Sequence, residues 1–86
     1  MTEENAVEIG KIAHFFSKIS VAVIELKAPL SAGDTILVKG PNTDFKQVVD
    51  SMQIEHNDVQ RAEAGQSIGL KVAQRVRETD TVYKKL

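Results

Sequence analysis

Apolar and polar residues alternate along several short stretches of the chain, and this alternation predicts β-strands. The clearest case is 67–72, where Ile68, Leu70 and Val72 would face a core and the residues between them would face solvent. The stretch 19–27 has apolar residues on both parities, which indicates a strand covered on both faces over part of its length. The pattern predicts about six strands, over 7–13, 19–27, 35–39, 45–55, 67–72 and 81–83.

Two glycine turns lie between predicted strands and share one chemistry. The stretches 30–38 and 62–72 each pass through small residues to a glycine, Gly33 or Gly65, and a polar residue follows before alternation resumes. Glycine adopts positive φ without a Cβ clash, so the chain can reverse direction there. Gly10, inside the first predicted strand, is expected to mark a β-bulge or a close approach of another backbone segment.

The remaining segments are interpreted as connections. Residues 14–18 show no clear period, Pro29 ends the second strand, and 40–44 has the composition of a loop. The segment 57–64 contains helix formers, but Gly65 stops it, so we expect a structured loop with at most one helical turn. Short strands at this spacing predict an all-β chain, and specifically a small six-stranded, closed, Greek-key-like β-barrel, because closure removes exposed strand edges.

Composition limits the classes of function. The chain has 86 residues, 42% of them hydrophobic and 27% charged, which is typical of a single globular domain, here expected over 7–86 after a loose lead-in at 1–6. The net charge of −1 argues against tight, non-specific nucleic-acid binding. No cysteine is present, so disulfides and thiolate metal sites are excluded. The longest apolar run, 19–26, is shorter than the roughly 20 residues of a membrane span, and we expect a cytoplasmic protein.

The glycine turns and their flanking strands resemble the second-domain β-barrel of translational GTPases of the elongation factor Tu type. Two departures are the 14–18 stretch, which differs from the usual first hairpin, and Thr79-Asp80, which replaces the usual final glycine. The chain is most similar to stand-alone elongation-factor-like proteins. It is more distantly similar to the barrel appended to peptidase-like or hydroxylase enzymes of the collagenase-like family. The matching stretches are 10–12, 30–36, 51–54, 62–70 and 77–82.

The resemblance implies a non-catalytic module that contacts tRNA, ribosomal RNA or the translation apparatus. The chain lacks the P-loop string that cradles nucleotide phosphates, so GTP is not expected, and no other cofactor is indicated. It also lacks a nucleophile-elbow motif, and no spacing of carboxylates recommends acid–base catalysis. We therefore expect a binding protein and not an enzyme.

Candidate contact residues for RNA or a partner come from two segments. In the first, exposed aromatic and basic side chains suit base stacking and phosphate contact. Adjacent Phe15 and Phe16 cannot both face inward from a regular strand, so we expect one of them to be exposed. In the second, positive charge gathers in the last sixteen residues, as in an RNA-facing patch or an ordinary solvated face. The candidates are His14, Phe16, Lys18, Lys71, Arg75, Arg77, Lys84 and Lys85.

Two alternatives stay open. In the first, the chain is a protein–protein interaction domain that works with a larger enzyme, such as a collagenase-like peptidase or hydroxylase. The near-zero net charge and the Phe15–Phe16 pair motivate it. In the second, His14 and His56 meet in the fold and bind a metal with Glu55 or Asp58. Against that, the two histidines have no local ligand spacing, and each could simply lie at a strand end.

Overall fold

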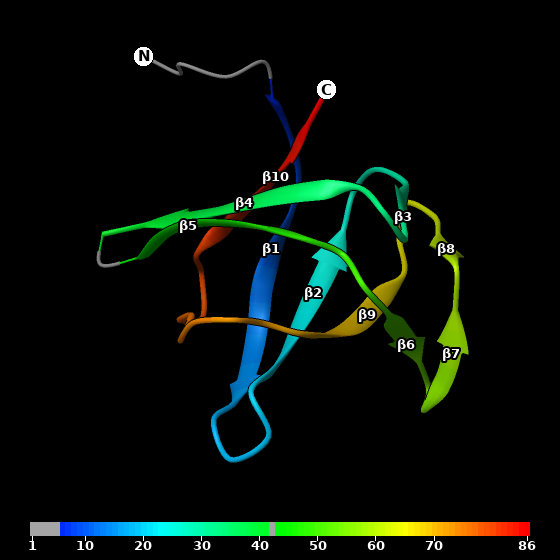
Figure 1. The fold of residues 1–86 in the computed structure, drawn as a ribbon, viewed down its shortest axis with the longest axis horizontal. Helices are drawn as coiled ribbons and strands as arrows, with labels where there is room; N and C mark the ends of the chain where they lie inside the picture. Colours follow the sequence, from blue (N-terminus) through cyan, green and yellow to red (C-terminus); the bar gives the residue numbers. More distant parts are fainter. Residues whose placement is uncertain (1–5, 42) are drawn as a thin grey trace.

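The chain is all β in the computed structural model, which describes residues 6–41 and 43–86 (Figure 1). Eight of the described strands form one antiparallel sheet in the order β5-β4-β10-β1-β2-β9-β6-β7, and β3 pairs separately with β8. The strands are β1 Ala6–Phe16, β2 Val21–Leu26, β3 Leu30–Ser31, β4 Thr35–Gly40, β5 Thr43–Val48, β6 Met52–Ile54, β7 Asn57–Val59, β8 Arg61–Ala62, β9 Ser67–Lys71 and β10 Thr81–Lys85.

The all-β prediction is confirmed, while several boundaries differ. Of the predicted lead-in 1–6, residues 1–5 lie outside the described residues and Ala6 already belongs to β1. The segment 57–64 forms strands β7 and β8 with no helical turn. Among the described residues, no helix has the length and apolar character needed to cross a membrane.

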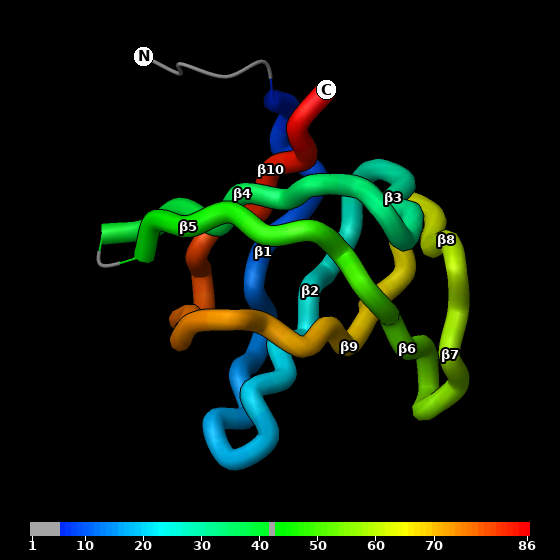
Figure 2. The backbone as a smooth tube through the Cα atoms, viewed as in Figure 1, coloured from blue at the N-terminus to red at the C-terminus, as the bar shows by residue number. Residues whose placement is uncertain are grey.

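The predicted closed barrel is wrong, because the sheet is open. Its strand order ends at β5 on one side and at β7 on the other, with no ladder joining them. The sheet instead curls strongly, so that β4 and β5 cross the direction of β1 and β2 steeply in Figure 2. The expected strand 45–55 is two strands, β5 and β6, which lie in opposite halves of the sheet order.

The break between β5 and β6 is held by hydrogen bonds to the first glycine turn. Val49 lies in the core with 1% of its surface exposed. Its N–H donates to the Asp34 carbonyl at 2.8 Å, and its own carbonyl accepts from the Gly33 N–H at 2.8 Å. These bonds continue the β4–β5 pairing by one position and tie Val49 to the first glycine turn.

The side chain of Gln47 on β5 bonds to the backbone at the end of β9 and just after it. Its Nε2 donates to the Lys71 carbonyl at 3.0 Å, and its Oε1 accepts from the Ala73 N–H at 2.8 Å. A strand neighbour would make the same donor and acceptor pair with its peptide groups. One amide side chain therefore links β5 to the chain at the end of β9.

The core lies inside the curl and draws from nearly every strand. The predicted inward positions Ile68, Leu70 and Val72 are each at most 4% exposed, which confirms that alternation. On β2 only one parity, Ala22, Ile24 and Leu26, is buried, and the other parity is partly exposed. The fully buried larger side chains are Ile9, Ile12, Ile24, Leu30, Ile36, Met52, Ile68, Leu70, Val38, Val49, Val76 and Val82.

β1 is longer than predicted, since residues 14–16 belong to the strand and not to a connection. The register against β2 shifts between Ile12 and His14, and this irregularity lets pairing continue to Phe16. Both expectations for Gly10 are confirmed. The register against β10 shifts between Glu8 and Gly10, and a Cβ on Gly10 would overlap the main chain of Glu25.

The two glycine turns adopt one hydrogen-bonded geometry, and a third turn repeats it. In 31–34, 63–66 and 77–80 the fourth N–H donates to the first carbonyl, at 3.1, 3.2 and 3.1 Å. The first N–H of each donates to the side-chain oxygen of the fourth residue, at 2.9, 2.7 and 2.9 Å. The third residue has positive φ in every case: Gly33 at 94°, Gly65 at 90° and Thr79 at 78°. This is the position where a type II turn requires glycine.

Replacing Thr79 by glycine is therefore expected to stabilise the chain. A β-branched residue at positive φ is strained by about 1–3 kcal/mol, while glycine costs about 0.5–1 kcal/mol of extra unfolded-state entropy. We expect Thr79→Gly to raise the free energy of unfolding by about 1 kcal/mol, measured by urea denaturation. Glu78→Gly, one residue earlier in the same turn, is the control and is expected to lower it. Equal effects of the two substitutions would contradict the strain.

Candidate functional site

An apolar groove lies on the outer face of β2 and β9. Its volume is 530 Å³, which lies within the range of about 300–1,000 Å³ typical of binding pockets. It extends from the β1–β2 loop to the turn between β6 and β7. The lining residues are Phe16, Ile19, Val21, Val23, Gln53, Glu55, His56, Ser67, Ile68 and Gly69, hereafter the groove.

Strand register explains why the floor of the groove is apolar. Val21 and Val23 occupy the outward parity of β2, and Phe16 is the cross-strand partner of Val21 on β1. Gly69 on β9 is the partner of Val23 and has no side chain to fill the space above the sheet. The missing side chain at Gly69 produces the depth, because the sheet surface is uncovered there.

Two large apolar side chains at one end of the groove are open to solvent. Phe16, the last residue of β1, is 46% exposed, and Ile19 in the following loop is 59% exposed. Full burial of a side chain of this size is favourable by about 1.5–3 kcal/mol. Clustered exposed apolar residues beside a hollow mark an interaction surface more often than isolated ones do.

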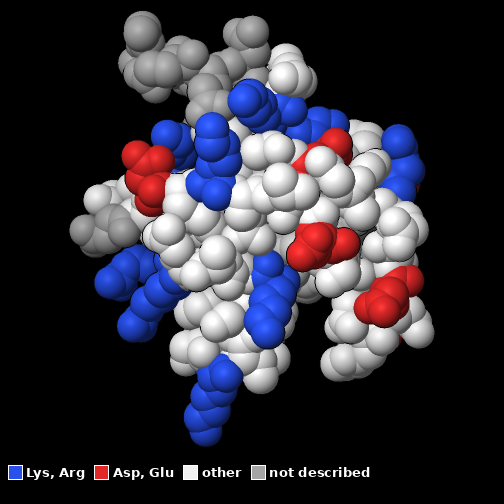
Figure 3. Space-filling model, viewed as in Figure 1, with Lys and Arg blue, Asp and Glu red and all other residues white. Residues whose placement is uncertain are grey.

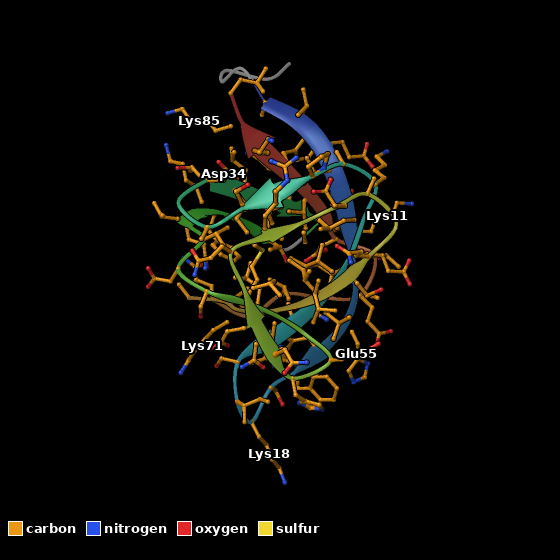
Figure 4. The ribbon with its side chains drawn as sticks, turned by 90° about the vertical axis from the view of Figure 1, so that its right-hand side faces the viewer. Lys11, Lys18, Asp34, Glu55, Lys71 and Lys85 are labelled. Atoms are coloured by element: carbon orange, nitrogen blue, oxygen red, sulfur yellow. The ribbon has the colours of Figure 1, made fainter. Side chains whose placement is uncertain are left out.

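The other end of the groove is formed by a strained two-residue turn. Ile54 pairs with Asn57, which leaves Glu55 and His56 as the turn residues between β6 and β7. Both have positive φ, 51° and 67°, the geometry that usually selects Asn-Gly. Figure 4 shows Glu55 towards the same end of the molecule as Lys18, on the β1–β2 loop.

Three of the predicted contact residues lie at or near the groove. Phe16 lines it directly. His14, two residues earlier on β1, stacks edge-on against Phe16 with ring centroids 4.4 Å apart, and its Nδ1 is 2.9 Å from Glu78 Oε2. Lys18 extends away from the body of the molecule at the loop tip (Figure 4). Phe15 packs partly buried against the core, so the expectation that one of the two phenylalanines is exposed is confirmed.

The other predicted contact residues lie elsewhere. Lys71 ends β9 beside a second hollow of 300 Å³ near Gln47, and Arg75 and Arg77 line a third of 380 Å³. Lys84 and Lys85 lie on β10 beside the start of β1, the end opposite to Phe16. Figure 4 places Lys85 and Lys18 at opposite ends, and Figure 3 shows basic side chains in separate groups over one face. The structure therefore does not gather all the basic candidates into one patch: Arg75 and Arg77 share a hollow with Glu78, the partner of His14, whereas Lys84 and Lys85 lie at the other end of β1.

The proposed metal-binding pair is not assembled as a cluster. His14 contacts Glu78 and Phe16, whereas His56 lies in the β6–β7 turn. Within 6–41 and 43–86, no group of three or more His, Cys, Asp or Glu side chains is arranged to hold a metal ion.

Sequence reasoning missed most of the groove, although one signal pointed to it. The double apolar parity of 19–27 predicted a strand covered on both faces, yet Val21 and Val23 are only partly covered in the described structure. An apolar strand face without a cover within its own domain is a candidate for contact with another molecule. The contributions of Gly69 and Glu55 follow from strand pairing, and the sequence pattern carried no sign of them.

Comparison with known proteins corrects the resemblance to elongation factors. The chain is 49% identical over 78 residues to an uncharacterized protease of Methanocaldococcus jannaschii, covering 90% of this chain and 19% of that protein. It is 34% identical over 80 residues to a collagenase of Porphyromonas gingivalis, covering 91% of this chain and 19% of that protein. No protein-family model matches the chain. The main predictions of an elongation-factor-like protein, a role in translation and RNA binding were wrong, since these relatives are a protease and a collagenase.

Solved structures identify the fold. The crystal structure of the C-terminal domain of a Geobacillus thermoleovorans putative U32 peptidase superimposes with a TM-score of 0.85 at 20% identity, covering 100% of this chain and 97% of that one. A selenomethionine variant of the same domain gives a TM-score of 0.84 at 19% identity, covering 88% of this chain and 96% of that one. The chain spans about a fifth of the length of the curated relatives. It therefore has the fold of a U32 peptidase C-terminal domain, and its sequence is similar to one segment of proteins named protease and collagenase.

Proposed function

We propose that this chain is a non-catalytic protein-binding domain that works with a peptidase. The observation that carries the proposal is the groove, where Phe16 and Ile19 expose apolar surface beside the uncovered face of β2. Sequence similarity to segments of a protease and a collagenase indicates the kind of enzyme that it serves. In this role the chain contacts protein through its apolar surface, and the peptidase chemistry belongs to the rest of the enzyme.

An apolar surface suits this role energetically. Covering an exposed phenylalanine or isoleucine by a partner is favourable, and aromatic residues are enriched in protein–protein interfaces. The near-zero net charge fits a partner held by shape and apolar contact more than by long-range attraction. In this role the apolar groove binds a partner and does not itself carry out a reaction.

The test uses the collagenase of Porphyromonas gingivalis, with its matching segment deleted or replaced by this chain. We expect deletion to lower the rate of collagen cleavage by about ten-fold or more, because loss of one central contact costs about 1.4 kcal/mol or more. We expect replacement by this chain to restore cleavage, and replacement by its Phe16→Ser, Ile19→Ser variant to restore much less.

Two further results decide the proposal. The chain assayed alone should cleave neither collagen nor gelatin, and cleavage by the purified chain would overturn its non-catalytic role. Full cleavage of collagen by the enzyme that lacks the segment would show that the segment does not contribute to peptidase activity. The Val48→Ser replacement is the control for a change of exposed apolar surface, since Val48 is 56% exposed and lies outside the groove.

A further inference from the structure

We propose that the groove binds an extended peptide segment that carries aliphatic side chains and a lysine or arginine. This inference rests on the proposed function and adds the chemistry of the partner. The lining is mainly apolar, and the groove's 530 Å³ is enough for a few side chains. Aliphatic side chains over Val21, Val23 and Gly69 would cover the exposed parity of β2.

Glu55 favours a basic residue on the occupant. Among the described residues lining the groove, Glu55 carries the one formal charge, if the histidine is neutral. No ion pair joins Glu55 to another described residue, whereas Glu63, Asp44 and Glu8 each have a basic partner within 3 Å. A basic side chain on the occupant would supply the missing partner, as complementary charges do across interfaces.

The turn conformation sets where that carboxylate lies. Glu55 and His56 both have positive φ, a conformation that is costly for residues other than glycine. In the strand order, Phe16 on β1 and the β6–β7 turn lie on opposite sides of β2 and β9, and both line the groove. An occupant would therefore lie across β2 and β9, with its aliphatic part between Phe16 and Gly69 and its basic part towards Glu55.

The experiment titrates the full 86-residue chain, labelled with ¹⁵N, with three synthetic peptides. The probe is Gly-Ser-Leu-Leu-Arg-Ser-Gly with blocked ends. One comparison peptide replaces Arg by Glu, and the other replaces both Leu by Ser. We expect saturable amide shifts at Val21, Val23, Gly69 and Glu55 with the probe. Binding should be roughly three- to ten-fold weaker for the Glu peptide and absent for the Ser peptide.

Protein variants test the same contacts from the other side. Gly69 has ordinary backbone geometry, and an added Cβ meets its nearest atom, Val21 Cγ1, at 3.5 Å. Gly69→Leu should therefore fold normally, fill the groove and abolish the shifts. Glu55→Gln should weaken binding of the Arg peptide by about two- to five-fold. It should not weaken binding of the Glu peptide. Val48→Ser and Asp50→Asn, both at the separate hollow near Gln47, are the matched controls and should change nothing.

Several results would overturn the inference. These are an absence of shifts at the groove amides at millimolar probe, unchanged binding by the folded Gly69→Leu variant, or equal binding of the Arg and Glu peptides. Shifts of the same amides with protein concentration alone would identify a second copy of the chain as the occupant. If the peptide arm fails while deletion still impairs the collagenase, the peptidase role stands and only the peptide chemistry is wrong.

Discussion

Gly10→Ala is expected to lower the free energy of unfolding by about 3 kcal/mol, among the largest effects of any single substitution in this chain. A Cβ at Gly10 would overlap the carbonyl oxygen of Glu25, and the carbonyl carbon would be only 3.1 Å away. Both atoms belong to the backbone of the neighbouring strand, so no side chain can rotate to relieve the contact. Gly10 is also paired on both sides, with Leu26 on β2 and Val82 on β10.

Gly69→Ala is the matched control, because it places the same methyl group on a strand of the same sheet. The nearest atoms to an added Cβ there are 3.5 and 4.0 Å away, which is ordinary van der Waals contact. We expect the control to change the free energy of unfolding by less than about 1 kcal/mol, measured by urea denaturation followed by circular dichroism. Similar effects at the two glycines would contradict the close approach of β1 and β2.

Ile24→Ala should cost about 2–5 kcal/mol of stability. Ile24 is fully buried in the middle of β2, and truncation removes apolar contacts and leaves a cavity. A total stability of about 5–15 kcal/mol is typical for a domain, so this single change threatens folding at physiological temperature. The midpoint of thermal unfolding is the direct measurement.

Val23→Ala, at the adjacent residue, should cost less than about 1 kcal/mol. Val23 is partly exposed and faces the groove, so truncation removes little buried surface. The contrast between these neighbours measures how open the outer face of β2 is in solution. A large loss at Val23 would show that something in the chain covers the groove, and would remove the basis for the binding surface.

The mistaken resemblance to elongation factors has an identifiable source. The stretches that carried it, above all 62–70, are mainly a glycine turn followed by an alternating strand. Such turns are selected by the backbone geometry of a compact β-domain, and three copies of one geometry occur within this chain alone. Turn and core residues report the kind of fold more than its function. The distant similarity to collagenase-like enzymes pointed in the direction that the comparisons support.

The local sequence was sufficient to predict features that depend on only a few neighbouring residues. Alternation at 67–72 placed Ile68, Leu70 and Val72 in the core, and the two glycine turns were recognisable from composition. The positive φ of Thr79 was hidden, because a β-branched residue occupies the position where glycine would have signalled the turn. In the sequence, Thr79-Asp80 stands where the resemblance to elongation factors implies a glycine.

Strand order, the open edge and the groove were decided by the tertiary structure. The strand order leaves β5 and β7 as the two open edges, and the contacts of Val49 with Gly33 and of Gln47 with Lys71 join residues far apart in sequence. The groove likewise exists because Gly69 lies opposite Val23 in the register. A period-two pattern specifies which face a side chain takes within its own strand. It carries no information on which strand lies alongside, and the uncovered surface is a property of that pairing.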